Sequence, residues 1–306
     1  MDFLDKAKNI FIFIYIVYLC YISYPILKLF KIDNFNYSKN VKKLAICIIC
    51  RDDEECLKEN IEYHSSIGVE HFIIYDNNSK NPLKNALKSY KNVTVLDWPG
   101  KLQQFFCYLD CLNKFKTKFK WIAFIDIDEF IVMKDGSIDL KDFLDPYCQY
   151  GGLGINWLCF GSSGHLKKQK SVINGFTIAS FKHSQNSRIK SIVNTKYVLC
   201  PSRNAHCFIY KTGAVFVDED FINISSSINR LYAPRKTKQI KRSKIQINHY
   251  IVRSREDFNL RKSRPAFSNT SRCSEEFWNS FQNGSKDTAI LDLIKRVKKS
   301  KKTSKH

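Results

Sequence analysis

The sequence predicts an α/β fold, a Rossmann-type mixed sheet with helices on both faces, preceded by one transmembrane helix. Three observations lead to this prediction. In the first half of the chain, short apolar runs rich in β-branched residues alternate with stretches of helical periodicity. Each of these apolar runs ends in acidic residues. An uncharged stretch of membrane-spanning length precedes the first of them.

Strands and helices alternate between residues 44 and 125. Gly68 stands just past the first predicted helix, where glycine commonly ends one. Pro82 stands near the start of the second, a favourable place for proline. Strands that alternate with helices favour a parallel sheet covered on both faces. The predicted strands are 44–50, 71–76, 93–98 and 121–125, and the predicted helices are 54–67, 82–90 and 102–115.

The amino-terminal region contains an uncharged apolar segment. No charged side chain occurs from Ile10 to Leu27, which is close to the ~20 residues that a helix needs to span a bilayer. Because no small-residue cleavage site follows, a retained anchor is favoured over a cleaved signal peptide and over a buried core helix. The sequence therefore predicts a single-pass membrane protein with a short tail at 1–9, an anchor at 10–30 and a linker at 31–43.

Two signals disagree about the side of the membrane on which the main domain lies. More lysines follow the anchor than precede it, which favours the cytoplasm by the positive-inside rule. N-x-S/T triplets favour a Golgi-type lumen instead, because such triplets accept N-linked glycans. The side therefore stays open. The triplets begin at Asn36, Asn77, Asn92, Asn223, Asn269 and Asn283.

The composition narrows the classes of function. Lysine and arginine number 50 against 29 acidic residues, a formal charge of +21, so the folded surface attracts phosphate, anionic lipid or nucleic acid. Because no RNA-recognition motif, helix-turn-helix pattern or zinc finger is present, a nucleic-acid partner is not expected. The lack of a Gly-x-Gly-x-x-Gly or Walker loop argues against dinucleotide oxidoreductases and P-loop nucleotidases.

Cys47 and Cys50 have the spacing of a CxxC motif. They lie in a predicted strand, which would point the two thiols to opposite faces of the sheet. A shared zinc ion is therefore disfavoured, and both cysteines are expected to be small buried apolar residues.

Acidic residues stand where the predicted strands end, and in α/β sheets ligands bind beyond the carboxyl ends of the strands. Asp52 follows the first strand, and Asp76 and Asp97 lie at the ends of the second and third. The fourth ends in Asp126 and Asp128, separated by one residue, so both carboxylates project from one face toward one hard cation. In a basic protein this arrangement indicates a divalent cation that bridges to a phosphate.

Several short blocks occur together and in order from the first predicted helix to about Arg264. They read Glu62-Tyr63-His64, Gly68 to Ser79, Asp126-Ile127-Asp128-Glu129-Phe130, Phe160 to His165, Asn248-His249-Tyr250-Ile251, Arg253-Ser254 and Asp257-Phe258. Their order and joint presence resemble glycosyltransferase family 92, whose members look like metal-dependent enzymes of the GT-A fold. The resemblance implies a GT-A-like domain, which we place at 44–284. The residues that follow, 285–306, are expected to form a basic carboxyl-terminal helix or tail. The like-charged run at 295–302 in that tail is expected to be solvated and disordered.

The resemblance also implies a reaction. It implies a metal-dependent inverting glycosyltransferase that moves a hexose onto a glycan hydroxyl, with Mn²⁺ or another divalent cation as cofactor and UDP-galactose as the expected donor. A transferase that uses another UDP-sugar is the nearest alternative. A non-catalytic protein of the same fold that binds a glycan or an anion is a further one. The acceptor and the oligomeric state are left open.

The same resemblance implies roles for individual residues. Asp128 is expected to bind Mn²⁺ directly, and Asp126 to contact both the ribose and the metal. His249 is expected to be the third metal ligand, because imidazole can join carboxylates around such an ion. Asp76 is expected to bind the uracil or the ribose, and His165 is a further candidate for donor binding. Asp52 is a donor-binding candidate from its place at the end of the first strand, because the chain reads Arg51-Asp52-Asp53-Glu54 where similar proteins carry an Asn-Glu pair.

Inverting transfer requires a base that removes the acceptor proton, and a carboxylate is an ordinary choice. Asp218 and Asp220 follow a strand-like run at 214–217, and either is a candidate for this base. A solvated turn is the alternative for both. Trp157 and Phe160 are expected either to form an apolar platform for a sugar ring or to pack in the core.

Overall fold

The computed structural model describes residues 35–202, 206–211, 213–225, 235–262 and 274–303. The predicted amino-terminal tail and membrane anchor, at 1–30, lie outside these ranges. Within them, no helix is both long and apolar enough to cross a bilayer.

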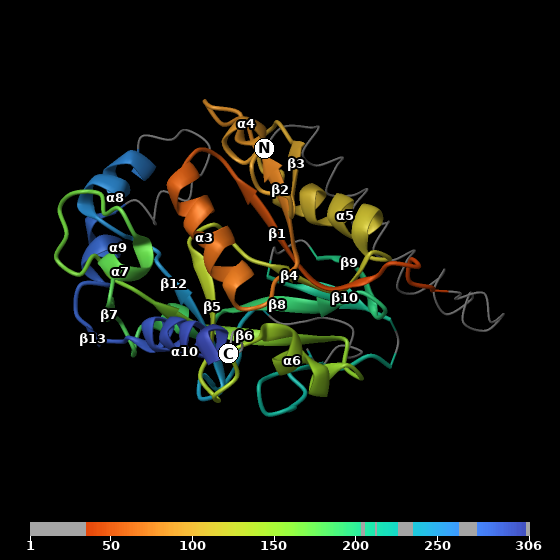
Figure 1. Cartoon of the computed structure of the whole chain (residues 1–306). Helices are drawn as coiled ribbons and strands as arrows, with labels where there is room; N and C mark the ends of the chain where they lie inside the picture. The colour runs from red at the N-terminus through yellow and green to blue at the C-terminus, as the bar shows by residue number, and fades with distance from the viewer. Residues whose placement is uncertain (1–34, 203–205, 212, 226–234, 263–273, 304–306) are drawn as a thin grey trace, which may run out of the picture.

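A nine-stranded mixed sheet forms the centre of the described part of the chain (Figure 1). Its strands are β1 (Lys42–Cys50), β2 (His71–Asp76), β3 (Val93–Asp97), β4 (Phe119–Phe124), β5 (Glu129–Met133), β6 (Gly152–Cys159), β8 (Ile189–Asn194), β11 (Phe216–Val217) and β12 (Ile245–His249). The order is β3-β2-β1-β4-β8-β6-β12-β5, with β11 paired to β6. The strands predicted from the sequence, β1 to β4, are mutually parallel as expected. β8 is antiparallel to both β4 and β6, and β5 is antiparallel to β12, so the predicted mixed sheet is confirmed.

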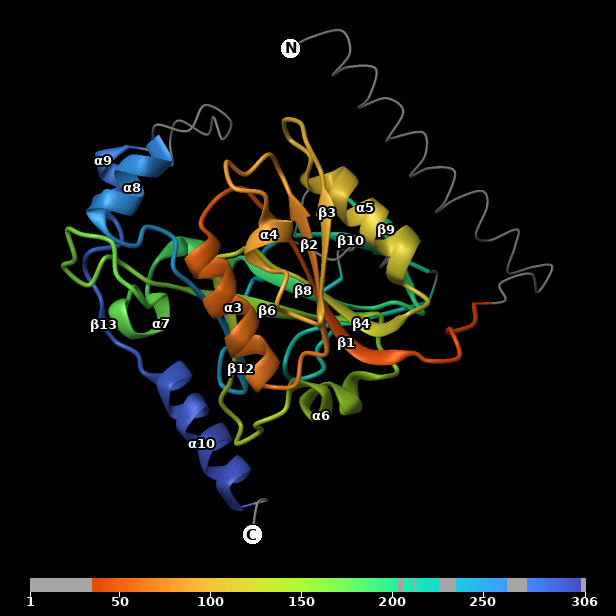
Figure 2. The ribbon, with the colours of Figure 1, turned by 45° about the horizontal axis from the view of Figure 1, so that its top comes forward.

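Both faces of this sheet are covered, as predicted. Figure 2 shows α3 and α5 on either side of the parallel strands. In β1, Ile46 and Ile48 point into one core, whereas Ala45 and Cys47 point into the other. The first core is closed by α3 (Glu54–Ser66), α4 (Leu83–Ala86), α6 (Leu140–Leu144) and α10 (Ala289–Thr303). The second core is closed by α5 (Gln104–Phe115) and by the hairpin of β9 (Val198–Pro201) and β10 (Phe208–Tyr210). Cys50 lies in the first core and Cys47 in the second, which confirms that their thiols face apart.

The remaining short elements lie around this sheet. They are η2 (Asp145–Tyr147), α7 (Val172–Gly175), β7 (Ile178–Ala179), η3 (Ser184–Ser187), α8 (Arg255–Lys262), α9 (Glu275–Asn279) and β13 (Ser285–Lys286). β7 and β13 pair with each other, so the segment before α10 is tied to the loop region after β6.

The predicted helices differ in how well their bounds match. The first is found as α3, and Gly68 follows it with a φ of +99°, a conformation that glycine adopts without strain. The predicted helix at 102–115 is found as α5. The helix predicted at 82–90 is shorter, because α4 ends at Ala86 and the chain then closes a separate turn from Leu87 to Tyr90.

The basic carboxyl-terminal run is helical, contrary to the expectation that it is disordered. α10 extends through this run to Thr303. The helix presents Ile290, Leu293 and Val297 to the first core, and Arg296 donates to the carbonyl of Met133 at 2.9 Å. Because this apolar stripe is anchored on the domain, the lysines are held on the outer face of a helix despite their mutual repulsion.

Candidate functional site

One edge of the sheet collects charged residues that are far apart in the sequence. The carboxyl ends of β4 and β12 meet there with the amino ends of β5 and β8, because β5 and β8 run in the opposite direction. This brings together Asp126, Asp128 and Glu129 with Lys190 and His249. It is the edge at which ligands bind in α/β sheets.

Asp128 and His249 face each other at this edge. An Asp128 carboxylate oxygen lies 3.7 Å from Nε2 of His249. Two ligands of one small divalent cation, each at about 2.1 Å, stand about 3.0–3.6 Å apart, so a small side-chain adjustment lets both atoms reach one ion. Burial raises the pKa of Asp128, and the Arg261 guanidinium, 3.5 Å away, opposes that rise. One carboxylate oxygen and one imidazole nitrogen form a donor set that a divalent transition-metal ion can accept.

Asp126, the third predicted metal ligand, is turned toward Lys190. Its carboxylate lies 2.9 Å from the Lys190 ammonium and accepts a hydrogen bond from Gln104 at 3.0 Å. Burial disfavours the ionised form of Asp126, but the Lys190 charge outweighs burial and lowers the pKa of Asp126 to about 2. Among the residues that the structure describes, no three His, Cys, Asp or Glu side chains are grouped as a metal site. The structure thus pairs two of the predicted ligands and engages the third in an ion pair.

Lys190 and Glu129 form the buried centre of this edge, with exposed fractions of 1% and 0%. The Glu129 carboxylate accepts a hydrogen bond from the backbone N–H of Asp126 at 2.8 Å and lies 3.5 Å from the Lys190 ammonium. Its other oxygen lies 3.9 Å from Nδ1 of His249. Burial raises the pKa of Glu129 well above its usual value, and the nearby ammonium opposes the rise. Glu129 therefore connects the strand end that carries Asp126 to the strand end that carries His249.

The sequence pattern gives no role to Lys190 or to Glu129. Lys190 lies at the start of β8, and its neighbourhood depends on the insertion of β8 between β4 and β6, which the alternating pattern of the first half did not predict. Glu129 stands beside Asp128 in the acidic block, and this was the one available signal. Full burial is unusual for a glutamate. In Glu129 it results from the pairing of β12 with β5, which places His249 opposite Glu129.

Helix α3 fixes the backbone of the acidic segment. Asn60 donates to the carbonyl oxygens of the two residues that flank Asp128, at 3.1 and 2.8 Å. The Tyr63 hydroxyl donates to the carbonyl of Ile131 at 2.6 Å, and Nε2 of His64 accepts from the N–H of Ile131 at 3.1 Å. Burial lowers the pKa of His64 to about 3, so its imidazole is neutral and can accept this bond. Tyr63 and His64, from the block Glu62-Tyr63-His64, therefore attach α3 to β5.

Asp52 and Asp76 lie at the same edge, where they hold the loop after β2. The two oxygens of Asp76 accept hydrogen bonds from the backbone N–H groups of Ser79 and Leu83, at 2.9 and 2.8 Å. Asp52 accepts from the N–H of Lys80 at 2.8 Å, and its own N–H donates to the Ser79 hydroxyl at 2.8 Å. Both carboxylates thus have a structural task in this loop, and their contact with a nucleotide stays a prediction.

His165 lies in the loop that follows β6. Its Nε2 is 2.9 Å from the carbonyl oxygen of Gly175, and its ring packs edge-on against Phe176. These contacts attach the loop to α7. A role for His165 in donor binding stays a prediction.

Trp157 and Phe160 are both buried, which decides between the two expectations for them. Neither forms an exposed platform for a sugar ring, and both pack in the first core. The Trp157 ring lies 4.2 Å from the imidazole of His249. The Trp157 ring therefore packs against the imidazole of His249 and restricts its position.

Asp218 and Asp220, the predicted bases, lie at the opposite end of the sheet. Asp218 is 3.1 Å from Lys241, and Asp220 is 2.8 Å from Lys244. Lys244 directly precedes β12, and His249 ends it. Since a strand rises about 3.3 Å per residue, about 13 Å of β12 separates the two acids from the edge that carries Asp128 and His249.

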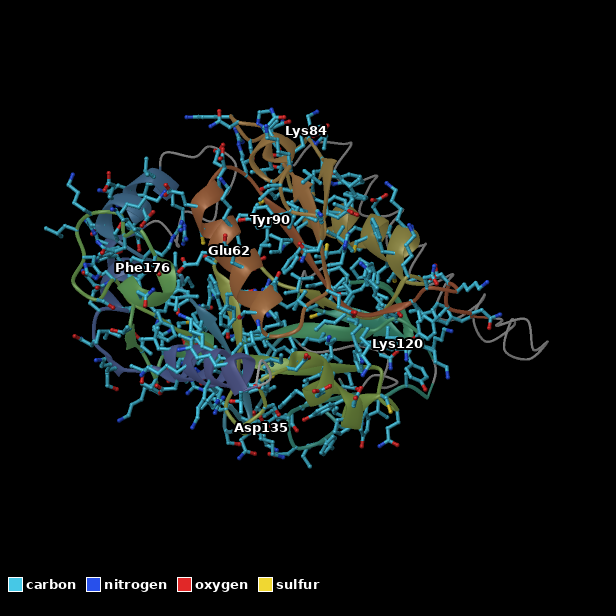
Figure 3. The ribbon with its side chains drawn as sticks, in the orientation of Figure 1. Glu62, Lys84, Tyr90, Lys120, Asp135 and Phe176 are labelled. Atoms are coloured by element: carbon cyan, nitrogen blue, oxygen red, sulfur yellow. The ribbon has the colours of Figure 1, made fainter. Side chains whose placement is uncertain are left out.

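The expectation that one of these acids is the base is therefore corrected. The cause is β11, which pairs with the amino end of β6 at Gly152 and Leu153 and ends after two residues, so the acids that follow it stay at the end of the sheet away from Asp128. Figure 3 helps to locate this far end of the sheet: Asp135, which follows the end of β5 away from Asp128, is labelled at the bottom of the molecule, and Lys84 of α4 at the top.

The chain is similar to proteins of one family over most of its length. The model of glycosyltransferase family 92 matches residues 42–288. A glycosyltransferase family 92 protein of Oryza sativa subsp. japonica is 33% identical over 195 residues, which are 60% of this chain and 32% of that protein. One of Ricinus communis is 30% identical over 189 residues, which are 58% of this chain and 33% of that protein. The chain thus spans about a third of the length of these curated relatives.

Solved structures overlap with parts of the chain. A mannosyltransferase from Pyrobaculum calidifontis in complex with GDP-Man and Mn²⁺ superposes with a TM-score of 0.31 at 9% identity, covering 44% of this chain and 42% of that one. A 4-diphosphocytidyl-2C-methyl-D-erythritol synthase from Anaerococcus prevotii gives a TM-score of 0.30 at 11% identity, covering 51% and 71%. Similarity at this level carries no argument about the site.

Proposed function

The chain belongs to glycosyltransferase family 92, and from this premise we propose that it is a metal-dependent glycosyltransferase. The proposed donor is a UDP-sugar, with UDP-galactose first among the candidates. The proposed acceptor is a hydroxyl group of a glycan, and the proposed stereochemical course is inversion. Family membership supports sugar transfer, and the chemistry of the acidic edge supports the need for a cation.

The observation that carries the proposal is the approach of Asp128 and His249 to 3.7 Å at the ligand-binding edge of the sheet. These two residues would hold a divalent cation such as Mn²⁺, with Asp126 beside them toward the ribose. When bound, such an ion supplies positive charge to the diphosphate of the leaving nucleotide. Arg261, 3.5 Å from Asp128, adds a fixed positive charge on the same side.

Side chains of the protein itself hold the site in order before the donor binds. Lys190 balances Asp126 and Glu129, so the edge is assembled before a ligand arrives. Glu129 and the Trp157 ring hold the imidazole of His249 from two sides. This support keeps Nε2 of His249 directed at Asp128, and prior orientation of that kind reduces the reorganisation needed on binding.

Release of UDP from a panel of UDP-sugars tests the proposal. With Mn²⁺ present, we expect turnover with one UDP-hexose, loss of turnover in EDTA, and recovery when Mn²⁺ is restored in excess. UDP release that is equal in EDTA and in Mn²⁺ would contradict metal dependence. Failure with every UDP-sugar, in the presence of glycan acceptors, would favour a binding protein. NMR of the product tests inversion, which converts an α-linked donor sugar to a β-linked product.

We also propose that residues 10–30 anchor the protein in a membrane as a single-pass helix. The support is the uncharged run from Ile10 to Leu27, which has the length required. Resistance of the full chain to extraction by alkaline carbonate is the expected result, and release into the supernatant would refute it. Protease protection in sealed vesicles then distinguishes a lumenal from a cytoplasmic domain.

A further inference from the structure

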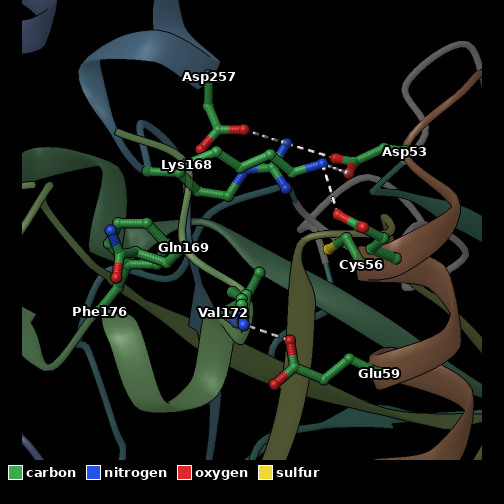
Figure 4. Close-up of a pocket in the computed structure, with 11 residues that line it drawn as sticks. Asp53, Cys56, Glu59, Lys168, Gln169, Val172, Phe176 and Asp257 are labelled. Carbon is green, nitrogen blue, oxygen red and sulfur yellow. Dashed lines mark hydrogen bonds and ion pairs between the residues drawn. The ribbon is translucent and has the colours of Figure 1, made fainter. Parts of the chain in front are cut away.

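A second cluster of charged residues lies where the start of α3 meets the start of α8 (Figure 4). Arg253 is at its centre and is 9% exposed. Its guanidinium lies 2.5 Å from Asp53, which precedes α3, and 3.9 Å from Asp257 in α8. Lys168 reaches the same cluster from the loop after β6, 2.8 Å from Glu55 and 3.9 Å from Asp53. Arg253 thus joins two helices that stand far apart in the sequence.

This cluster is a packed junction and leaves no space for a substrate. The free space between its side chains is about 10 Å³, room for a single water molecule. The carboxylates of Asp53 and Asp257 are themselves buried, with exposed fractions of 8% and 7%. Without a cation between them, two buried carboxylates would repel each other, so the guanidinium is needed to keep the junction closed.

The backbone at both ends of the main ion pair is in an unusual conformation. Asp53 has a φ of 64° and Arg253 a φ of 50°, values that residues with a Cβ seldom adopt. Such conformations persist where the surrounding structure enforces them, and they occur often at functional sites. Here the two strained residues are held by the contact between their own side chains.

Helix α8 connects this junction to the proposed metal site. Ser254 and Asp257 form a capping box at the start of α8: the Ser254 hydroxyl accepts from the N–H of Asp257 at 3.1 Å, and the Asp257 carboxylate accepts from the N–H of Ser254 at 3.3 Å. α8 then carries Arg261, whose guanidinium donates to the carbonyl of Ile251 and lies 3.5 Å from Asp128.

The segment before α8 touches the same acidic residue. The N–H of Tyr250 donates to the carbonyl oxygen of Asp128 at 3.0 Å. On the other side of the acidic segment, Asn60 of α3 holds the neighbouring carbonyl groups. The pair of Arg253 and Asp53 therefore joins the two elements that enclose Asp128, namely α3 and the segment 250–262.

We propose that Arg253 is a positioning residue of the donor site, which ties α8 to α3 so that Arg261 stays beside Asp128, where the donor diphosphate is bound. This inference rests on the proposed function. Arg253 itself touches no donor atom. Its effect passes through the position of α8, so its loss weakens donor binding more than it slows the chemical step.

The test compares Arg253→Gln with the control Arg255→Gln in the full chain. Arg255 lies two residues away in the first turn of α8, but it pairs outward with Glu275 at 2.7 Å. For Arg253→Gln we expect the KM for the UDP-sugar to rise about tenfold, the size of one lost charge-assisted hydrogen bond, with kcat within about threefold of wild type. Arg253→Lys keeps the charge but loses the planar fork, and its KM should lie between those of wild type and Arg253→Gln. Arg255→Gln should leave both constants unchanged.

Hydrogen exchange of the free protein supplies a readout that does not depend on activity. We expect faster exchange in 250–262 for Arg253→Gln and for Asp53→Asn, which cuts the same pair from the other side, and no change for Arg255→Gln. An unchanged KM beside a lowered melting temperature would leave Arg253 a purely structural role and refute the inference. Unchanged exchange in 250–262 would refute it as well. If the wild-type protein turns over no UDP-sugar, the proposed function fails, whereas the exchange result still decides whether Arg253 ties α8 to α3.

Discussion

Asp128→Asn is expected to lower kcat/KM for the UDP-sugar by about 10²–10³-fold, the usual effect of removing one preorganised electrostatic group from a site. Asparagine keeps the shape of the side chain but removes the negative charge that faces His249 across 3.7 Å, because an amide nitrogen replaces one of the two carboxylate oxygens. Because burial raises the pKa of Asp128, its ionised form is costly to the fold. The substitution should therefore leave the free energy of unfolding unchanged or slightly higher.

Two measurements with one control separate loss of metal from loss of fold. Calorimetric titration with Mn²⁺ should show weaker binding by Asp128→Asn, in parallel with the loss of turnover. Asp135→Asn is the matched control, because Asp135 follows the opposite end of the same strand, β5, and is exposed (Figure 3). It should retain wild-type activity and Mn²⁺ affinity. Equal turnover in Asp128→Asn and wild type would remove the basis of the metal assignment.

Lys190→Met is expected to reduce the free energy of unfolding by about 3–5 kcal/mol at pH 8, the range measured when one partner of a buried ion pair is removed. Asp126 and Glu129 then lose the ammonium that lies 2.9 and 3.5 Å from them. In the wild type this charge lowers the pKa of Asp126 to about 2 against the effect of burial. Without it, burial dominates for Glu129, whose side chain is 0% exposed, whereas the Asp126 side chain is 34% exposed.

The sign of the pH dependence follows from that change. In Lys190→Met the folded-state pKa of Glu129, which burial already raises in the wild type, lies still further above its unfolded value, so the folded state binds more protons than the unfolded state. Stability is then largest below the unfolded pKa, near 4, and falls as the pH rises through the folded pKa. The difference between variant and wild type should accordingly be smaller at pH 5 than at pH 8.

Urea unfolding at the two pH values measures this effect. Lys120→Met is the control, because Lys120 is an exposed lysine on the neighbouring strand β4, and it should change stability by less than about 0.5 kcal/mol. Adding Asp126→Asn and Glu129→Gln to Lys190→Met should recover most of the loss, since no uncompensated buried charge is left. A loss below 1 kcal/mol at pH 8, or a larger loss at pH 5, would contradict the assignment of Lys190 as the balancing charge.

The first half of the fold follows from local patterns. β1 to β4 and the helices α3 and α5 correspond to apolar runs, periodic stretches and the terminating Gly68, each of which acts within a few residues. The acidic strand ends could be placed at one edge for the same reason, since parallel strands that alternate with helices all end on one side. The sequence does not decide the position of Trp157, because an aromatic residue in an apolar run is compatible with either burial or exposure.

The second half depends on pairings between distant segments, and local patterns carry little information about them. β11 has two residues, and nothing in its neighbourhood indicates that it pairs at the amino end of β6, so the sequence does not show that Asp218 and Asp220 lie far from Asp128. The α10 lysines were expected to be disordered because a like-charged run is usually solvated. Burial of Ile290 and Leu293 at the start of the same helix overrides that tendency.

By itself, the sequence determined that this chain forms an α/β domain of glycosyltransferase family 92 with acidic residues at the ends of its parallel strands. Only the tertiary structure decided which of those acids face a common point. Asp128 meets His249, Asp126 meets Lys190, and Asp76 holds a loop. The physical reason is that hydrophobic periodicity sets strands and helices over short distances, whereas the partner of a buried charge is set by the order and direction of strands across the whole sheet.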